Sequence, residues 1–499
     1  MTLPLLPRCS GPLRVLVPCM LAVALAGCAL GPEFRAPTPE SPATWTQWRS
    51  SDEQLAGPEL ESALPDGNWW RAYHDPVLDE LQRRTRDTAP DLHTAALHLA
   101  QARVQRSTVQ AQALPQANLG GGVSRQRQSE NGASTRLLDV IGGEQTDSLK
   151  QALSEPFTVY QSGVDLSWEL DLWGRIRRSV EAADAGVMEQ AALLDMTRLS
   201  LASDVAATYF ALRTTQRRIA LTREDLLAME ERTAIIDAQV AGGLTDHLDS
   251  DRQHAELATL RASLPALLAS EGAQANQLAL LLGERPGALR ELLQPRAPAP
   301  VALPDLSLGL PSEVARRRPD IRAAESRLHA ATAQIGVARA ALYPSIRLGG
   351  KFGYESTTSG NLGDWGSRTW SVGPALDLPL FDHGRRTSVV KLRELQQQEA
   401  AVAYQHTVLQ AWKEIDDALS NYAALQHQRK ALEQRTALAA DAQGLAQARF
   451  DAGTVDFLAV IEAQRAAIQA RNELARNAGS LAAAFAQVNR AVGNVAGED

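Results

Sequence analysis

Residues 164–175 read VDLSWELDLWGR, and two periodicities meet inside this stretch. From Val164 to Leu170 apolar and polar residues alternate, which is the period of a strand with one apolar and one polar face. From Arg175 the chain runs to residue 241 without a proline, and apolar residues recur there every seven positions: Val205, Leu212, Ile219 and Leu226. The stretch therefore predicts a strand that leads into a helical rod of roughly 100 Å with a coiled-coil seam.

The same passage returns later in the chain, because residues 378–385 read LPLFDHGR. Three pairs of glycines lie 210 positions apart: Gly174 and Gly384, Gly243 and Gly453, Gly283 and Gly493. Two pairs of prolines lie 229 positions apart: Pro90 and Pro319, Pro115 and Pro344. A duplicated chain with one net insertion of about 19 residues within 124–156 accounts for both offsets.

The duplication divides the chain into six segments. They are a leader over 1–27, an N-terminal segment over 28–75, repeat 1 over 76–283, a proline-rich connection over 284–311, repeat 2 over 312–493 and a tail over 494–499. Each repeat is predicted to carry a helical stretch, two strands, a long helix and a return helix: 76–113, 116–127, 157–171, 175–241 and 247–282, then 312–342, 345–356, 367–380, 385–450 and 457–490. The second long helix has its own apolar seam, with spacings of four and three: Val408, Trp412, Ile415, Leu419 and Tyr422. These seams need partner helices to cover them.

The first residues have the order of an export signal. Two arginines precede a short apolar run, which ends at Leu25-Ala26-Gly27-Cys28. This ending resembles the lipoprotein box of bacteria, which implies cleavage before Cys28 and attachment of a diacylglycerol and an N-acyl chain to that residue. The alternative is a plain signal peptide with a chance cysteine. Ala29, in place of an aspartate, favours the outer membrane.

Composition excludes several classes of protein. The 499 residues carry a net charge of −8. Lys and Arg are therefore not in excess, which disfavours a nucleic-acid-binding protein. All three cysteines lie within the first 28 residues, which rules out a four-cysteine metal site or a disulfide framework. His93 with His98, and His247 with His254, lack the i, i+4 spacing of a helical metal pair, and nucleotide-binding or hydrolase motifs are missing. We expect neither an enzyme nor a resident cofactor.

The predicted strands cannot form a closed structure by themselves. No stretch after the leader has the roughly 18–20 apolar residues of a transmembrane helix, so a mature chain that crosses a membrane must use strands. Four strands leave unpaired edges in lipid, and single-chain barrels start at about eight strands. Three copies would supply twelve. The alternative is a soluble α+β lipoprotein with two packed hairpins.

Taken together, these residues resemble the TolC-like outer-membrane factors of tripartite efflux pumps, in the lipoprotein branch of the NodT type. The resemblance covers nearly the whole mature chain. It rests on Gly31-Pro32-Glu33-Phe34 after Cys28, on Trp69-Trp70 with Asp75-Pro76, on residues 168–175 and on Phe450-Asp451-Ala452-Gly453 with Asp456-Phe457-Leu458.

The resemblance implies an α+β membrane protein that works as a homotrimer. Four transmembrane strands per chain would form a 12-stranded β-barrel in the outer membrane of a Gram-negative bacterium, and the long helices would form a tunnel in the periplasm. A belt near the middle would hold the termini and the connection over 284–311. The expected partners are outer-membrane lipid, a periplasmic adaptor protein and an inner-membrane pump of the RND type.

A passive conduit needs a gate. The resemblance places the closed end of the tunnel just after the second helix turn, at Asp456, Leu458 and Glu462. Leu458 and Glu462 are i, i+4 on one helix face. Around a symmetry axis they would form an apolar constriction and a ring of carboxylates, which is a device of cation-selective pores. The alternative is an ordinary helix face inside a coiled coil.

The helix turns would also form the tip that docks on the adaptor. The candidate residues come from both repeats: Gly243, Asp246, Asp249 and Arg252 from the first, Gly453 and Thr454 from the second. The alternative for Asp246, Asp249 and Arg252 is a solvated face with local ion pairs.

Aromatic residues gather in and beside the strands, where we expect several of them to form belts at the membrane interfaces. They are Trp168, Trp173, Phe352, Tyr354, Trp365, Trp370 and Phe381. For Trp173 and Phe381 we favour packing in a core at the base of the strands. The polar loop over 128–156 is predicted to project outward.

Two other functions remain open. One is a conduit of the same fold that serves type I protein secretion. The other is a structural lipoprotein of the envelope that has no pore. The leader motif and Trp69-Trp70 favour efflux of small toxic compounds over protein secretion.

Overall fold

The computed structural model describes residues 29–45, 47–49, 52, 55, 67–132, 146–294, 308 and 310–495. The leader, Cys28 and parts of the predicted loop, connection and tail lie outside these residues. The described chain forms two compact units. Unit 1 takes residues up to 35, 102–186 and 328–399, and unit 2 takes residues 36–101, 187–327 and those from 400 onward.

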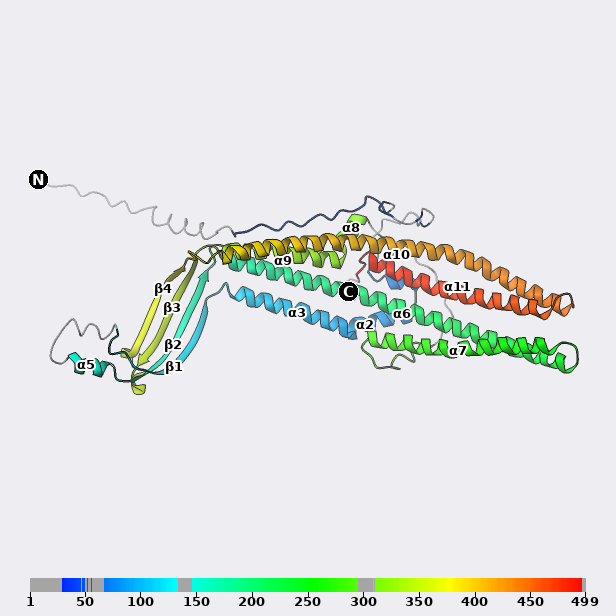
Figure 1. Cartoon of the computed structure of the whole chain (residues 1–499), viewed down its shortest axis with the longest axis horizontal. Coiled ribbons are helices and arrows are strands. Elements are labelled where there is room, and N and C mark those ends of the chain that lie inside the picture. The colour runs from blue at the N-terminus through cyan, green and yellow to red at the C-terminus, as the bar shows by residue number, and fades with distance from the viewer. Residues whose placement is uncertain are drawn as a thin grey trace. The chain divides into compact units, whose positions relative to one another are not determined.

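The elements follow the same order in both halves of the chain (Figure 1). After the short turn η2 (Trp69–Tyr73), the first half has α2 (Pro76–Thr88), α3 (Pro90–Ala111), β1 (Gln116–Gln126), α5 (Thr146–Leu153), β2 (Phe157–Leu170), α6 (Arg175–Ala241) and α7 (His247–Leu281). The second half has α8 (Pro311–Arg317), α9 (Pro319–Ala340), β3 (Ser345–Ser356), η3 (Ser359–Asn361), η4 (Trp365–Ser367), β4 (Arg368–Asp377), α10 (Arg385–Asp451) and α11 (Phe457–Ala491). The predicted strands and long helices are confirmed.

Four predicted segments differ in detail. The helical stretches 76–113 and 312–342 are each broken in two, at Ala89 and at Arg318, because a proline follows each of these residues and opens the next helix. Part of the loop over 128–156 is the helix α5. Strand β4 ends at Asp377, three residues early, because its partner β3 begins at Ser345 and offers no ladder beyond it.

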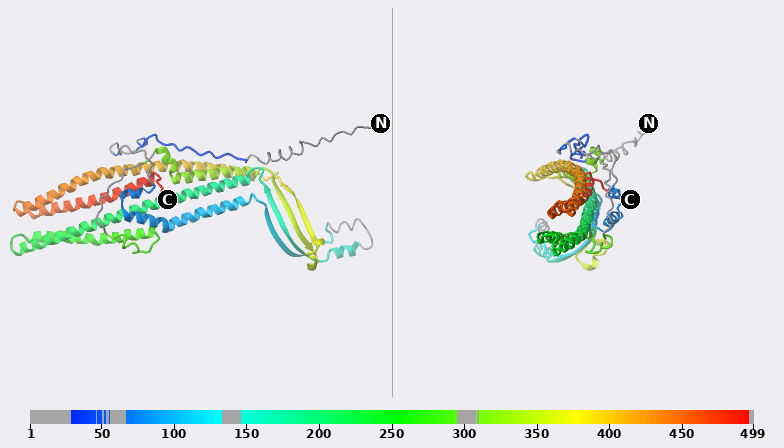
Figure 2. Two further views of the ribbon diagram at one scale, coloured as in Figure 1. Left: turned by 180° about the vertical axis from the view of Figure 1, so that it is seen from behind. Right: turned by 90° about the vertical axis from the view of Figure 1, so that its right-hand side faces the viewer.

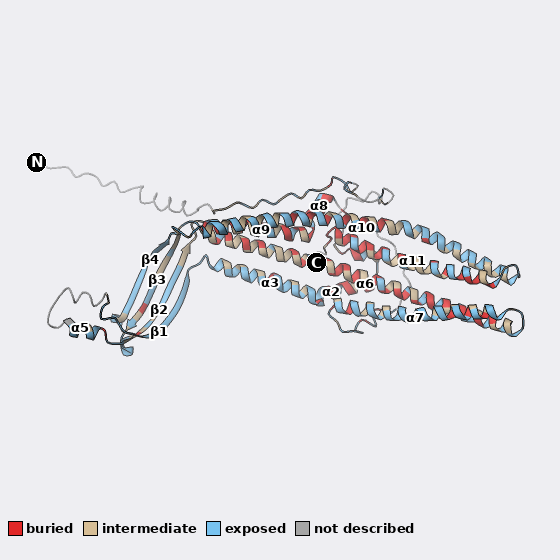
Figure 3. Ribbon diagram, viewed as in Figure 1, coloured by how far each residue is buried: buried red, intermediate tan, exposed pale blue. Residues whose placement is uncertain are grey.

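Unit 1 contains one antiparallel sheet in the order β1-β2-β3-β4. The register aligns apolar residues in a row across all four strands: Leu119, Val164, Phe352 and Trp370. These side chains are 82%, 42%, 48% and 70% exposed, and Figure 3 shows the strands as mostly exposed. On the other face, Asp165 lies opposite Lys351 and Glu169 opposite Arg347. The sheet therefore has one apolar and one polar face, as predicted, and β4 tolerates Pro374 because it is an edge strand.

The base of the sheet is anchored by residues of the 168–175 stretch. The Trp168 indole N–H donates to the Ala113 carbonyl at 2.9 Å, and the Trp173 indole N–H donates to the Pro344 carbonyl at 2.7 Å. Trp173 is half-buried against Tyr343, which confirms its predicted packing. The prediction for Phe381 is wrong, because its ring is 81% exposed and contacts His383. Phe381 follows the edge strand β4, and none of the described strands lies beyond β4 to cover it.

Unit 2 contains two helical hairpins, α6/α7 and α10/α11, which lie side by side in both views of Figure 2. Most residues of the predicted seams are buried: Val205, Leu212 and Ile219 on α6, and Val408, Ile415, Leu419 and Tyr422 on α10. Leu226 of the first seam is half-buried. Trp412 is partly buried beside the second seam. Among the described residues, no helix is long and apolar enough to span a membrane.

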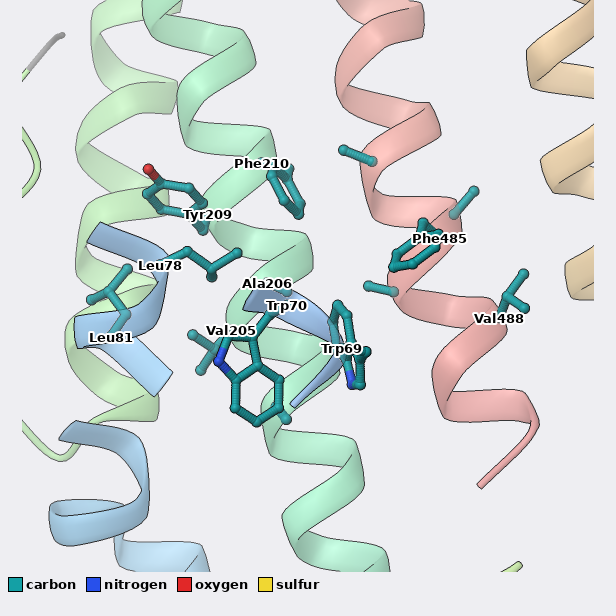
Figure 4. Packing of buried hydrophobic residues seen from close by; sticks show 14 of the residues in the cluster. Trp69, Trp70, Leu78, Leu81, Val205, Ala206, Tyr209, Phe210, Phe485 and Val488 are labelled. Carbon is teal, nitrogen blue, oxygen red and sulfur yellow. The ribbon is translucent and has the colours of Figure 1, made fainter. Parts of the chain in front are cut away.

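The largest core of unit 2 forms around the two tryptophans of η2 (Figure 4). Trp69 lies between α6 and α11, with its ring 5.6 Å from that of Trp70 and 6.2 Å from that of Phe485. Beside them, the buried Tyr209 hydroxyl donates to the Asp75 carboxylate at 2.5 Å. Asp75 also accepts from the Val77 N–H and so caps α2. The Trp-Trp pair and the Asp-Pro pair of the sequence thus fix the start of α2 against α6.

All four helices of the two hairpins end in the same way. At the end of α6, the Gly243 N–H donates to the Val240 carbonyl and the Leu244 N–H donates to the Gln239 carbonyl, which is a Schellman motif. The equivalent bonds close α7, α10 and α11. The glycines at these four turns, which are Gly243, Gly283, Gly453 and Gly493, have φ between +69° and +73°. This left-handed conformation explains why glycines recur at a fixed offset.

Two of these glycines provide a matched test of the turn. A Cβ at residue 453 would meet no atom within 4 Å, whereas a Cβ at residue 493 would lie 2.9 Å from Cγ and 3.0 Å from Cα of the buried Arg318. We expect Gly453→Ala to lower the free energy of unfolding by about 1 kcal/mol through backbone strain alone. Gly493→Ala is expected to cost clearly more, because Arg318 must also move. Denaturant titration in detergent measures both, and equal losses would contradict this account.

A second test compares two ion pairs of α6. Asp225 is 4% exposed and pairs with Arg471 of α11, whereas the exposed Glu230 pairs with Arg261 of α7 at 2.6 Å. Removing one member of a buried pair leaves an uncompensated charge, so we expect Asp225→Ala to cost about 3 kcal/mol of unfolding free energy. The control Glu230→Ala is expected to cost less than about 1 kcal/mol. The double variant Asp225→Leu with Arg471→Met should recover most of the loss, and a double variant as unstable as Asp225→Ala would argue against this assignment.

Candidate functional site

The turns between the paired helices of unit 2 hold the predicted gate and docking residues. In the first turn, Asp246 is the N-cap of α7, and its side chain accepts from the Leu248 N–H at 3.4 Å. In the second turn, Asp456 is the N-cap of α11, and its side chain accepts from the Ala459 N–H at 3.1 Å. Both aspartates therefore set where the return helices begin. A capping role gives them a structural reason to occur at the same offset.

The second turn rests on an apolar cluster that the sequence analysis did not single out. Phe457, Val460 and Ile461 of α11 are buried against Ile236 of α6. The Phe457 ring lies 5.3 Å from that of Phe450 at the end of α10. The spacing of these residues by three and four was the available signal. The cluster fixes the rotation of α11, which decides where its other residues lie.

Leu458 and Glu462 lie outside this cluster. Leu458 is half-buried, and Glu462 is exposed. The Glu462 carboxylate makes no hydrogen bond or ion pair with any residue that the structure describes. Its neighbour Arg465 pairs instead with Glu256 of α7. A leucine and a carboxylate without an ion-pair partner among the described residues thus lie one helical turn apart at the start of α11. Their role as a gate stays a prediction.

The first turn has different chemistry. Asp249 accepts from the Thr245 hydroxyl at 3.1 Å and pairs with Arg252 at 3.6 Å. These are the local ion pairs that the sequence analysis weighed against a docking role. The exposed residues of this turn include two leucines, Leu244 and Leu248, for which the sequence had suggested no role. Leu248 occupies the position of Leu458 at the offset of 210, and that equivalence was the missed signal.

Polar contacts join the return helix of the second repeat to both helices of the first. Arg465 donates to Glu256 of α7, Arg471 to Asp225 of α6, and Arg232 of α6 to Gln464. The hydrogen bond from Arg465 lowers the pKa of Glu256. Burial lowers the pKa of the Arg232 guanidinium and raises that of the Asp225 carboxyl. Such contacts resist separation of the two hairpins.

The described residues contain no group of three His, Cys, Asp or Glu side chains that could hold a metal ion. His254 is instead 3.2 Å from the Asp237 carboxylate of α6, and His93 is 3.1 Å from the Asp87 carbonyl. Both contacts are local to unit 2.

Known proteins share this architecture. The outer membrane efflux protein family matches residues 81–284 and 310–494. Outer membrane protein OprJ of Pseudomonas aeruginosa is 33% identical over 451 residues, which cover 89% of this chain and 88% of that protein. The toluene efflux pump outer membrane protein TtgF of Pseudomonas putida is 30% identical over 452 residues, 89% of each chain.

A solved structure of the outer-membrane channel OprN superposes with a TM-score of 0.82 at 28% identity, over 94% of this chain and 99% of that one. The family match covers both repeats, and the structural likeness extends over the sheet and the helical hairpins alike. The chain therefore belongs to the outer membrane efflux protein family of TolC-like channels, and its place is the outer membrane.

Proposed function

We propose that three copies of this chain form a passive conduit through the outer membrane. The observation that supports this most is the sheet of unit 1, which exposes one apolar face and leaves the outer edges of β1 and β4 unpaired. Unpaired backbone groups are costly in lipid. If β4 of one copy pairs with β1 of the next, three copies close twelve strands into a barrel with the apolar face toward lipid.

The polar face of the sheet would then line the lumen. Asp165, Glu169, Arg347, Lys351 and Glu355 share this face. Such a conduit transports compounds without making or breaking bonds, so we propose no enzymatic activity and no resident cofactor. Specificity for cargo would reside in the pump.

The conduit would be gated at the hairpin turns. Three copies of Leu458 and Glu462 around an axis would narrow the passage with an apolar ring and a carboxylate ring. Asp456, as the cap of α11, would hold these residues in place. Opening would need the contacts between the hairpins, such as that between Arg465 and Glu256, to shift.

The same turns would dock a periplasmic adaptor protein that couples the conduit to an inner-membrane pump, which we expect to be of the RND type. Gly243, Asp246, Asp249, Arg252, Gly453 and Thr454 would lie at this tip. The exposed Leu244 and Leu248 add apolar surface for the contact. TtgF is named for a pump that exports toluene, which supports small toxic compounds as the cargo of this chain.

A lipid anchor at Cys28 would add a second attachment to the membrane. In unit 1, the Leu30 N–H donates to the Trp173 carbonyl at 3.1 Å. A Cβ at Gly174 would lie 2.8 Å from Ala29, so this segment passes closely over the junction between β2 and α6. The diacylglycerol and N-acyl chains on the adjacent residue would then begin at the base of the strands, where the membrane surface is expected.

The gate can be tested in planar bilayers. We expect the double variant Leu458→Ala with Glu462→Ala to raise the basal conductance of the isolated assembly several-fold, because both rings are lost. Leu227 and Glu231 provide a matched control, since they are also a leucine and a glutamate at i, i+4, and both are exposed on α6 away from the turn. The control variant Leu227→Ala with Glu231→Ala should conduct like the parent. Unchanged conductance of the first variant would overturn the gate.

The assembly can be tested by mass. We expect the detergent-extracted protein to be a trimer under native conditions, and the denatured chain to carry acyl mass on residue 28. A Cys28→Ser variant should lose that acyl mass. A monodisperse monomer that does not conduct would overturn the conduit and favour the structural lipoprotein, and a trimer without acyl mass would overturn the anchor alone.

A further inference from the structure

The helices α6 and α11 run antiparallel in unit 2 and form the seam between the two repeats. Along this seam, charged residues face partners of suitable chemistry. Near the core, Asp204 pairs with Arg490 at 3.3 Å. Toward the turns, Asp225 pairs with Arg471, and Arg232 donates to Gln464. At each of these levels the charged side chain on α6 therefore has a guanidinium or amide partner on α11.

One level between them breaks this pattern. Thr214 and Gly479 touch so closely that a Cβ at residue 479 would collide with the Thr214 hydroxyl. One turn further toward the tips, α6 carries Arg218 and α11 carries Arg476. Since the helices are antiparallel, the contact at Thr214 and Gly479 brings these two arginines to the same level of the seam.

Neither guanidinium has an anionic partner. Within the part of the chain that the structure describes, Arg218 and Arg476 make no hydrogen bond or ion pair, and the Arg218 Nε is buried without an acceptor. The nearby acids are engaged elsewhere, because Glu473 pairs with Arg435 and Asp225 pairs with Arg471. Two cations thus lie at one level of the seam without a carboxylate partner among the described residues, whereas Asp204, Asp225 and Arg232 each have a partner across the seam.

The pKa of Arg218 responds to this arrangement. Burial and the charge of Arg476 both lower the pKa of the Arg218 guanidinium. Two like charges repel, and a buried polar atom without a partner costs free energy as well. An anion between the two side chains would remove both costs. Guanidinium groups suit this task, because their planar N–H forks match the oxygens of phosphate and carboxylate.

We propose that Arg218 and Arg476 form a binding site for a small oxyanion, such as phosphate, which bridges the two repeats. The occupant is a soluble anion, because the side chain of Arg476 is exposed and can be reached from solvent. The site belongs to the single chain and does not depend on the conduit. An anion there clamps α6 to α11 in the middle of the hairpins.

The test is thermal unfolding of the full chain in detergent, with phosphate or chloride at equal ionic strength. We expect phosphate to raise the Tm of the parent by on the order of 2 °C more than that of Arg476→Gln. In chloride alone, Arg476→Gln should unfold at a higher Tm than the parent, because the repulsion is gone. Phosphate also stabilises proteins by exclusion from their surface, and that effect cancels in the comparison of variants.

Arg223→Gln is the matched control, since Arg223 is an exposed arginine on the same helix without a hydrogen bond or ion pair to the described residues. It should respond to phosphate like the parent. Arg218→Met should lose the response like Arg476→Gln. Equal responses of the parent and Arg476→Gln would overturn the site. A lower Tm of Arg476→Gln in chloride would also overturn it, because the arginines would then be neutralised by a carboxylate from a second copy.

Discussion

The seam between α6 and α11 is the contact on which the arrangement of unit 2 depends. It is one place where the two repeats meet within the chain, and it buries Phe210 of α6 and Phe485 of α11, which both contact the ring of Tyr73. The tryptophans of η2 pack into the same core and bring the N-terminal segment to it. Because the helices are so long, small residues and paired charges along the seam decide their register as much as the apolar core does.

The duplication gives the two hairpins the same backbone and different chemistry. Both return helices begin at an aspartate cap after a left-handed glycine. At the offset of 210, however, His247 corresponds to Phe457 and Arg252 corresponds to Glu462. The first turn is held by local polar contacts, whereas the second is anchored by a buried phenylalanine. One repeated turn thus presents two chemically distinct surfaces in the same chain.

The ion pairs in the seam between α6 and α11 affect the register of these helices more than their stability. Buried ion pairs contribute little net stability, but they are expensive to break and they fix one register. Such contacts would suit the gating proposed above, in which the helices stay closed in one state and shift in another. Arg218 and Arg476 differ from these pairs, because no carboxylate of the described chain forms an ion pair with either of them.

The sequence by itself determined the duplication, the strands and the long helices, because alternation, heptad spacing, proline and glycine act locally and each repeat confirms the other. It also indicated the turns as the place of interest. The breaks at Ala89 and Arg318 also follow from the local sequence, because a proline comes next in each case. The exposure of Phe381 depended on its place beyond the end of the edge strand β4. Only the tertiary structure paired Asp225 with Arg471 and placed Arg218 beside Arg476. These contacts join residues about 250 positions apart, and nothing in local periodicity specifies which turn of one helix meets which turn of the other.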